Sequence, residues 1–163
     1  MNSLCIKECK LIYISSIFFL PLPLTANIEF NINSFLIFKI MKEGLTYTST
    51  TIVTNDNCAV TMGSGNLMVF ASPAMVALMV NAAMMAVASY LPEGSTTVGG
   101  GLDVQHTRPS GIGATINASA ILREVEGRKL TFYVTACDEK GTIGEGTHVR
   151  YIVDEERFMQ KVK

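Results

Sequence analysis

Two histidines are the side chains in this sequence best suited to acid–base chemistry. His106 ends a strand-like stretch, GGGLDVQH, that begins with the three glycines Gly99–Gly101. An imidazole at a strand end can act as an acid, a base or a polarising group, although a purely structural histidine fits the same position. Glycines weaken a strand, and their usual reason is the close approach of another backbone or a ligand.

The second histidine has an arginine as its neighbour. His148 and Arg150 are two residues apart in GTIGEGTHVRYIV, so on a strand they face the same side. A guanidinium there could hold a phosphate or a carboxylate. The alternative is a surface arginine that pairs with Glu145 or Asp154.

Ser72 precedes Pro73, and the two residues read as the cap and the first residue of a helix. A helix N-terminus also presents unpaired N–H groups that stabilise a carbonyl oxygen gaining negative charge. We find no Ser–His–Asp order and do not interpret Ser72 as a nucleophile. Asn81 lies mid-helix, nine residues later. A buried amide needs partners, and it either bonds backbone across the sheet or lines a pocket.

The helix that carries Ser72 and Asn81 is predicted over residues 73–90, and the PEG at 92–94 ends it. Residues 67–92 contain no charged side chain, so this helix is apolar on every side. It must therefore be buried all round or lie in lipid. We favour burial, because amphipathic strands follow and need a core partner. One small domain cannot cover every side, which predicts a second copy in a symmetric dimer.

The strands are predicted from period-two alternation and turn residues. The expected strands span 46–53, a short 59–62, and then 96–106, 114–122, 129–137 and 144–153. Alternation and short turns favour an antiparallel meander of the last four. Residues 154–162 have the propensity of a short C-terminal helix.

Composition excludes several classes of function. The chain has 163 residues and a net charge of −1, and no run of Lys or Arg suggests a nucleic-acid partner. Its four cysteines show neither a CxxC pair nor a metal spacing, so we expect free thiols and neither a metal site nor a cofactor. The absence of a disulfide framework fits a reducing compartment, and we expect a cytoplasmic protein.

Residues 1–40 differ from the rest, because they contain none of the 13 glycines. Three interpretations compete: a signal peptide, a membrane anchor, and a leader foreign to the natural protein with Met41 as the true start. We favour the third and expect one domain over residues 41–163. A membrane association is expected only if the leader is real.

Four phrases together resemble the fluoroacetyl-CoA thioesterase-like branch of the hotdog-fold thioesterases. They are VFASPAMVALM, GGGLDVQH, LREVEGRKLTFYVTACDEKG and IGEGTHVRYIV. The resemblance runs from about residue 41 to residue 162. It implies an α+β hotdog fold, in which a curved antiparallel sheet of about five strands wraps a long central helix. It also implies a homodimer or dimer of dimers that hydrolyses a small acyl-CoA thioester in a cleft between subunits.

The resemblance also assigns residues. Carried over by position, the site hydroxyl is Ser72 and the site histidine is His106. Gly99 falls where a strand glycine contacts substrate, and Arg150 where an arginine binds substrate or orders the site. We add Asn81 as a further candidate for substrate binding.

One position departs from the pattern: the branch has a glutamate where this chain has Val80. A valine cannot accept a proton or orient water, and the loss of a catalytic carboxylate costs roughly 10²-fold or more. Asp103 is a poor substitute, because three residues before His106 it points to the opposite sheet face. The alternative function is therefore a non-catalytic protein that binds acyl-CoA or another small ligand.

Overall fold

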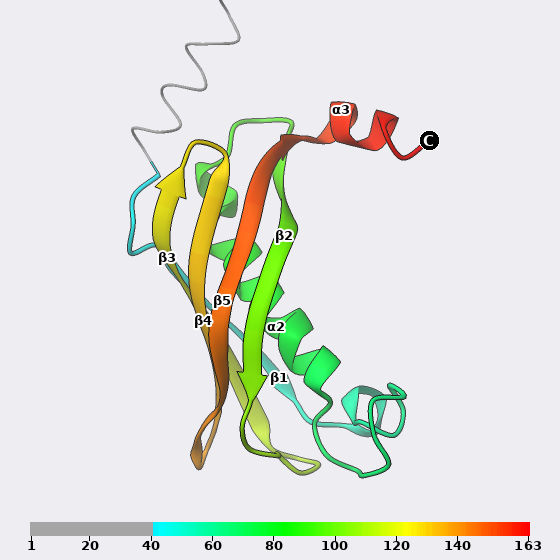
Figure 1. The fold of residues 1–163 in the computed structure, drawn as a ribbon. Helices are drawn as coiled ribbons and strands as arrows, with labels where there is room; N and C mark the ends of the chain where they lie inside the picture. Colours follow the sequence, from blue (N-terminus) through cyan, green and yellow to red (C-terminus); the bar gives the residue numbers. More distant parts are fainter. Residues whose placement is uncertain (1–40) are drawn as a thin grey trace, which may run out of the picture.

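A computed structural model describes residues 41–163, so the interpretations of the 1–40 segment lie outside the described residues. In chain order the elements are β1 (Thr46–Ile52), the 3₁₀ turn η1 (Asn55–Asn57), α2 (Ser72–Val87), the 3₁₀ turn η2 (Ala88–Tyr90), β2 (Ser95–His106), β3 (Thr115–Glu126), β4 (Lys129–Asp138), β5 (Gly141–Asp154) and α3 (Glu155–Gln160). Figure 1 shows α2 lying against one face of a curved sheet, with α3 projecting from the end of β5. This is the predicted α+β hotdog arrangement.

The sheet has five antiparallel strands in the order β1-β3-β4-β5-β2. Tight turns join β3 to β4 and β4 to β5, and these three strands form a meander. The prediction that β2 continues the meander is wrong, since β2 pairs with β5 at the sheet edge. The longer segment 107–114 allows the chain to pass from that edge, across β5 and β4, to β3.

The expected alternation of buried and exposed residues is confirmed on the two central strands. The inward side chains of β3 and β4 are fully buried: Ile116, Ala118, Ala120, Leu122, Leu130, Phe132, Val134 and Ala136. They pack with the buried face of α2, which consists of Met75, Met79, Ala82, Ala83, Ala86 and Val87. The prediction of a short strand at 59–62 is wrong, because Met62 N–H and Ser64 N–H donate to the carbonyls of Cys58 and Ala59 and close turns.

The sheet covers α2 on one side only. Pro73, Ala77, Asn81, Met85 and Ala88 are exposed and recur at the three- or four-residue spacing of one helix face. By length and composition, Ser72–Tyr90 could cross a membrane, a test that the core helices of water-soluble proteins also pass. Packing on the sheet explains the apolar residues of one face, while those of the exposed stripe have no cover among residues 41–163.

Candidate active site

The N-terminus of α2 meets the end of β2, and this contact brings Ser72 and His106 together. The loop before the helix pairs with the loop after the strand, through a bridge between Val69 and Gly111 and a 2.8 Å bond from Phe70 N–H to the carbonyl of Ser110. Ser72 Oγ and His106 Nδ1 then lie 2.8 Å apart. The two residues, 34 positions apart in sequence, form one polar pair on the inner side of the sheet.

The hydroxyl of Ser72 is available for this bond because it does not cap the helix. The predicted cap is wrong: Ala71 occupies the N-cap position, and no side chain makes a capping hydrogen bond. The first helical bond runs from Met75 N–H to the carbonyl of Ala71, 3.0 Å away. The N–H groups of Ser72 and Ala74 precede it, and Pro73 has none. The helix therefore presents a hydroxyl and two N–H groups in its first turn.

His106 keeps one nitrogen unused. Its Nε2 is buried and, among the described residues, has no hydrogen-bond partner. If Nδ1–H donates to Ser72, Nε2 is an acceptor, and in the other tautomer it is a donor. A buried polar atom without a partner is costly, so this nitrogen is placed for a ligand or a water molecule.

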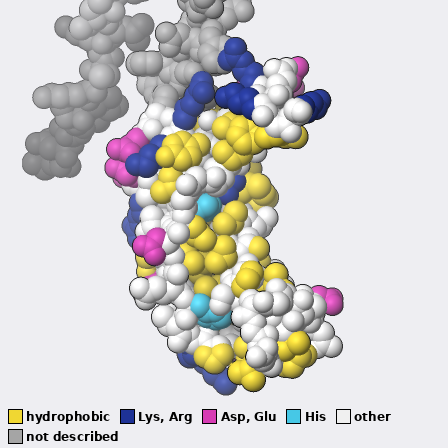
Figure 2. All heavy atoms as spheres, turned by 45° about the vertical axis from the view of Figure 1, so that its right-hand side comes forward, with side chains coloured by type: hydrophobic (Ala, Val, Ile, Leu, Met, Phe, Trp, Pro, Cys, Tyr) yellow, Lys and Arg dark blue, Asp and Glu magenta, His cyan; other side chains and the backbone are white. Residues whose placement is uncertain are grey.

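A hollow adjoins the Ser72–His106 pair. Its volume is about 320 Å³, and Ser72, parts of the 59–70 loop and residues 106–109 line it. Figure 2 shows the two histidines of the chain on one face of the molecule, with hydrophobic side chains between them. This face combines polar groups for a reacting carbonyl with an apolar surface for a small acyl group.

Asp138 anchors the loop that follows His106. Its carboxylate accepts hydrogen bonds from Arg108, from Ser110 Oγ (2.8 Å) and from Lys140 N–H (2.8 Å). Burial alone would raise the pKa of Asp138, but the hydrogen bonds from Ser110, Arg108 and Lys140 lower it from 3.8 to about 2. The sequence analysis did not single out this residue, because nothing local indicates that its partners Arg108 and Ser110 lie about 30 residues away.

Replacing Asp138 by asparagine should lower the free energy of unfolding at pH 7 by about 2 kcal/mol, which is the energy of its pKa shift. The native carboxylate binds protons more weakly than the unfolded one, so this stabilisation is full above pH 3.8 and is lost as the pH falls toward 2. Urea unfolding at pH 7 and pH 3 measures both effects. Glu126→Gln, in an exposed pair with Lys129, is the control and should change stability by less than about 0.5 kcal/mol. Equal losses in the two variants would contradict this account.

Gly99 and Arg150, two of the three predicted substrate-binding residues, face each other across β2 and β5. The Arg150 side chain is buried, and it donates from Nε to Thr97 Oγ1 (2.8 Å) and from Nη2 to the Thr97 carbonyl (2.6 Å). Burial lowers the pKa of this guanidinium. The alternative of a surface pair is wrong, because Glu145 accepts from Tyr133, and Asp154 caps α3.

Asn81 lies apart from the Ser72–His106 pair within the chain. Its Oδ1 accepts a 2.7 Å hydrogen bond from Ser49 Oγ on β1, so the partner of this oxygen is a side chain and not the expected backbone group. Nine residues at about 100° each place Asn81 half a turn around the helix from Ser72.

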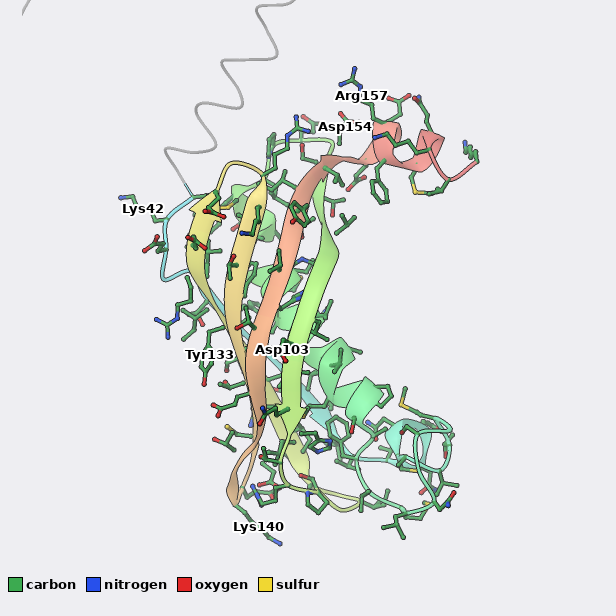
Figure 3. All side chains as sticks on the ribbon, in the orientation of Figure 1. Lys42, Asp103, Tyr133, Lys140, Asp154 and Arg157 are labelled. Atoms are coloured by element: carbon green, nitrogen blue, oxygen red, sulfur yellow. The ribbon has the colours of Figure 1, made fainter. Side chains whose placement is uncertain are left out.

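Neither position considered from the sequence as a source of a carboxylate supplies one to the pair. Val80 is half-buried in the middle of α2, and Asp103 lies on the sheet face turned away from the helix, as predicted (Figure 3). Among residues 41–163 no carboxylate hydrogen-bonds to Ser72 or His106, and no group of three or more His, Cys, Asp or Glu side chains could hold a metal. Cys58 and Cys137 are free thiols, as expected.

Comparison of the sequence with known proteins assigns this chain to one family. The family described as fluoroacetyl-CoA-specific thioesterase matches residues 53–156. A fluoroacetyl-CoA thioesterase from Streptantibioticus cattleyicolor is 42% identical over 95 residues, which are 58% of this chain and 68% of that protein.

Comparison with solved structures supports the same family and fold. The structure of the fluoroacetyl-CoA thioesterase FlK has a TM-score of 0.71 and 34% identity, covering 75% of this chain and 95% of that one. A thioesterase superfamily member from Thermus thermophilus, at 23% identity, shows the same fold with a TM-score of 0.69 over 74% of this chain and 90% of its own. The chain therefore belongs to the fluoroacetyl-CoA-specific thioesterase family of hotdog-fold proteins.

Proposed function

We propose that this protein hydrolyses a small acyl-CoA thioester in a cleft between two copies of the chain. The observation that carries the proposal is the Ser72–His106 contact of 2.8 Å at the N-terminus of α2, with the second imidazole nitrogen buried and unpartnered. Family membership supports the reaction class, since two relatives are named as thioesterases that act on fluoroacetyl-CoA.

In this reaction the thioester carbonyl oxygen lies at the first turn of α2. The Ser72 hydroxyl and the N–H groups of Ser72 and Ala74 stabilise the negative charge that develops on this oxygen. His106 Nε2 takes a proton from a water molecule as the water oxygen attacks the carbonyl carbon. When the carbon–sulfur bond breaks, the same proton returns to the leaving CoA thiolate. Arg150 and Gly99 bind the substrate from the neighbouring strands.

The exposed apolar surfaces support a dimer. β2 is an edge strand with an unpaired side, and Leu102 on it and Met85 on α2 are 42% and 39% exposed. Pairing two copies along β2 covers the edge and brings the two inner faces into one surface. The uncovered stripe of α2 then acquires a partner, and each hollow beside His106 becomes part of a shared cleft.

Replacing Leu102 by glutamate should therefore convert a dimer to a monomer, because it places a charge in the apolar interface. Size-exclusion chromatography with light scattering measures the mass. Ile52→Glu, at the opposite edge of the sheet and 56% exposed, is the matched control and should remain dimeric. A wild-type monomer, or a Leu102→Glu variant that stays dimeric, would refute an interface along β2.

The valine at position 80 favours a second candidate function, in which the protein binds an acyl-CoA or a small acid without hydrolysing it. Without the family's glutamate, the same cleft would hold its ligand without turnover. Thiol release from acyl-CoA esters of increasing chain length, measured beside thermal unfolding with the same esters, separates the two functions. Hydrolysis supports the enzyme, and a rise in unfolding temperature without thiol release supports the binding protein. If no ester gives thiol release or a rise in unfolding temperature, both functions are excluded.

A further inference from the structure

His148 is a buried titratable side chain that the proposed reaction does not use. It lies on β5, and only 3% of it is exposed. Its Nδ1 lies 2.8 Å from the carbonyl oxygen of Gly101, and its Nε2 lies 3.2 Å from Nη1 of Arg150. Both ring nitrogens are therefore engaged, each with a different neighbour.

These two contacts fix the protonation of the ring. An arginine only donates, so Nε2 accepts from Arg150, and the proton is on Nδ1, which donates to Gly101. Burial lowers the pKa of His148, and the nearby charge of Arg150 lowers it further against the opposing bond to Gly101. The ring is thus neutral at pH 7 and in a single tautomer.

The carbonyl of Gly101 belongs to an irregular part of β2. The pairing of β2 with β5 shifts between Gly99 and Gly101, which leaves Gly100 as an extra residue. A Cβ on Gly99 would lie 3.4 Å from Cε1 of His148. The imidazole therefore supports this bulge from the inner side of the sheet.

Arg150 is the other group that His148 holds. Its guanidinium is buried, and its three recorded hydrogen bonds go to the neutral acceptors Thr97 Oγ1, Thr97 O and His148 Nε2. Within residues 41–163 no carboxylate forms an ion pair with it. A guanidinium has five N–H donors, so two remain for a ligand or a second chain. A buried cation without a counter-charge needs such a partner.

We propose that His148 is a positioning residue, which uses one ring nitrogen to fix the Gly99–Gly101 bulge and the other to aim the guanidinium of Arg150 at an oxygen of the bound thioester. The inference rests on the proposed function, because it assumes that Gly99 and Arg150 contact substrate. It assigns His148 to binding and orientation, whereas His106 is assigned to proton transfer.

Three variants separate the two contacts. His148→Phe keeps the ring and removes both bonds, His148→Asn keeps a donor near the Nδ1 position, and His148→Gln places an amide oxygen near the Nε2 position. Losing a hydrogen bond to a charged group costs about tenfold or more. We therefore expect KM for the wild type's best acyl-CoA to rise about tenfold in the Phe and Asn variants, while kcat stays within about threefold of the wild type. In the Gln variant we expect KM within about threefold of the wild-type value. An equal rise of KM in all three variants, or no rise in any of them, would overturn the proposal.

A measurement on the unaltered protein tests the inference apart from turnover. Long-range ¹⁵N–¹H NMR at pH 7 should show His148 neutral, with the proton on Nδ1. A ring protonated on Nε2, or on both nitrogens, would overturn the proposal even if the variants fail to fold. If the wild type releases no thiol from any ester, the proposed function fails, whereas the NMR result and the affinity of the variants for CoA esters still decide the role of His148.

Discussion

Replacing His106 by alanine should lower kcat/KM for thioester hydrolysis by about 10²–10⁴-fold, the usual contribution of a positioned acid–base group. Among the side chains of residues 41–163 at the site, the imidazole is the one whose unused atom can take a proton from water. Its Nδ1 is held by Ser72 at 2.8 Å, and Nε2 is left buried without a partner. The loss should fall on kcat, since Arg150 and Gly99 remain to bind the substrate.

Thiol release under saturating acyl-CoA measures this loss. Gln105→Ala is the matched control, because Gln105 precedes His106 on β2 and is exposed. It should hydrolyse the ester at the wild-type rate. An alanine variant at His106 that keeps its wild-type kcat, with unchanged thermal unfolding, would show that the imidazole takes no part in the chemistry.

Replacing Val80 by glutamate should raise kcat, by roughly 10²-fold if the missing carboxylate limits the reaction. Val80 is half-buried in α2, eight residues after Ser72, at the position to which the resemblance assigns a glutamate. A carboxylate there would restore the group that the resemblance assigns to this position, which can accept a proton or orient the attacking water.

Val76→Glu is the control for this gain. Val76 is also half-buried and lies one turn earlier on the same face of α2, so it tests whether any added carboxylate has the effect. We expect no gain at that position. If both glutamates leave kcat unchanged while the wild type already turns over rapidly, the chain does not need a carboxylate, and the significance given to Val80 is wrong.

The fold was predictable because its signals are local and repeated. Alternation over β3 and β4 identified the buried side chains such as Ile116 and Phe132, and the uncharged run around Met79 identified the central helix. The strand order was not predictable from alternation alone. Which edge β2 joins depends on the path of the 107–114 segment, and no residue pattern encodes that path.

The candidate site was predictable in part. The resemblance to thioesterases paired Ser72 with His106, and the structure places their side chains in contact. The contacts of Asp138 with the Arg108 loop and of His148 with the β2 bulge were missed, since both join residues far apart in sequence. The assignment of Ser72 as a cap failed because capping geometry is set by the loop that enters the helix, and here Ala71 occupies that position.

The central claim is that one small thioester binds against the Ser72–His106 pair, in a cavity shared by two copies of the chain. A crystal structure of the full chain with a ketone analogue of acetyl-CoA, in which a methylene replaces the thioester sulfur, tests it most directly. We expect the ketone oxygen within about 3.2 Å of Ser72 Oγ or of the first N–H groups of α2, with residues of both copies around the ligand. An analogue bound away from both side chains, or an assembly in which the two lie on separate solvated surfaces, would contradict the account.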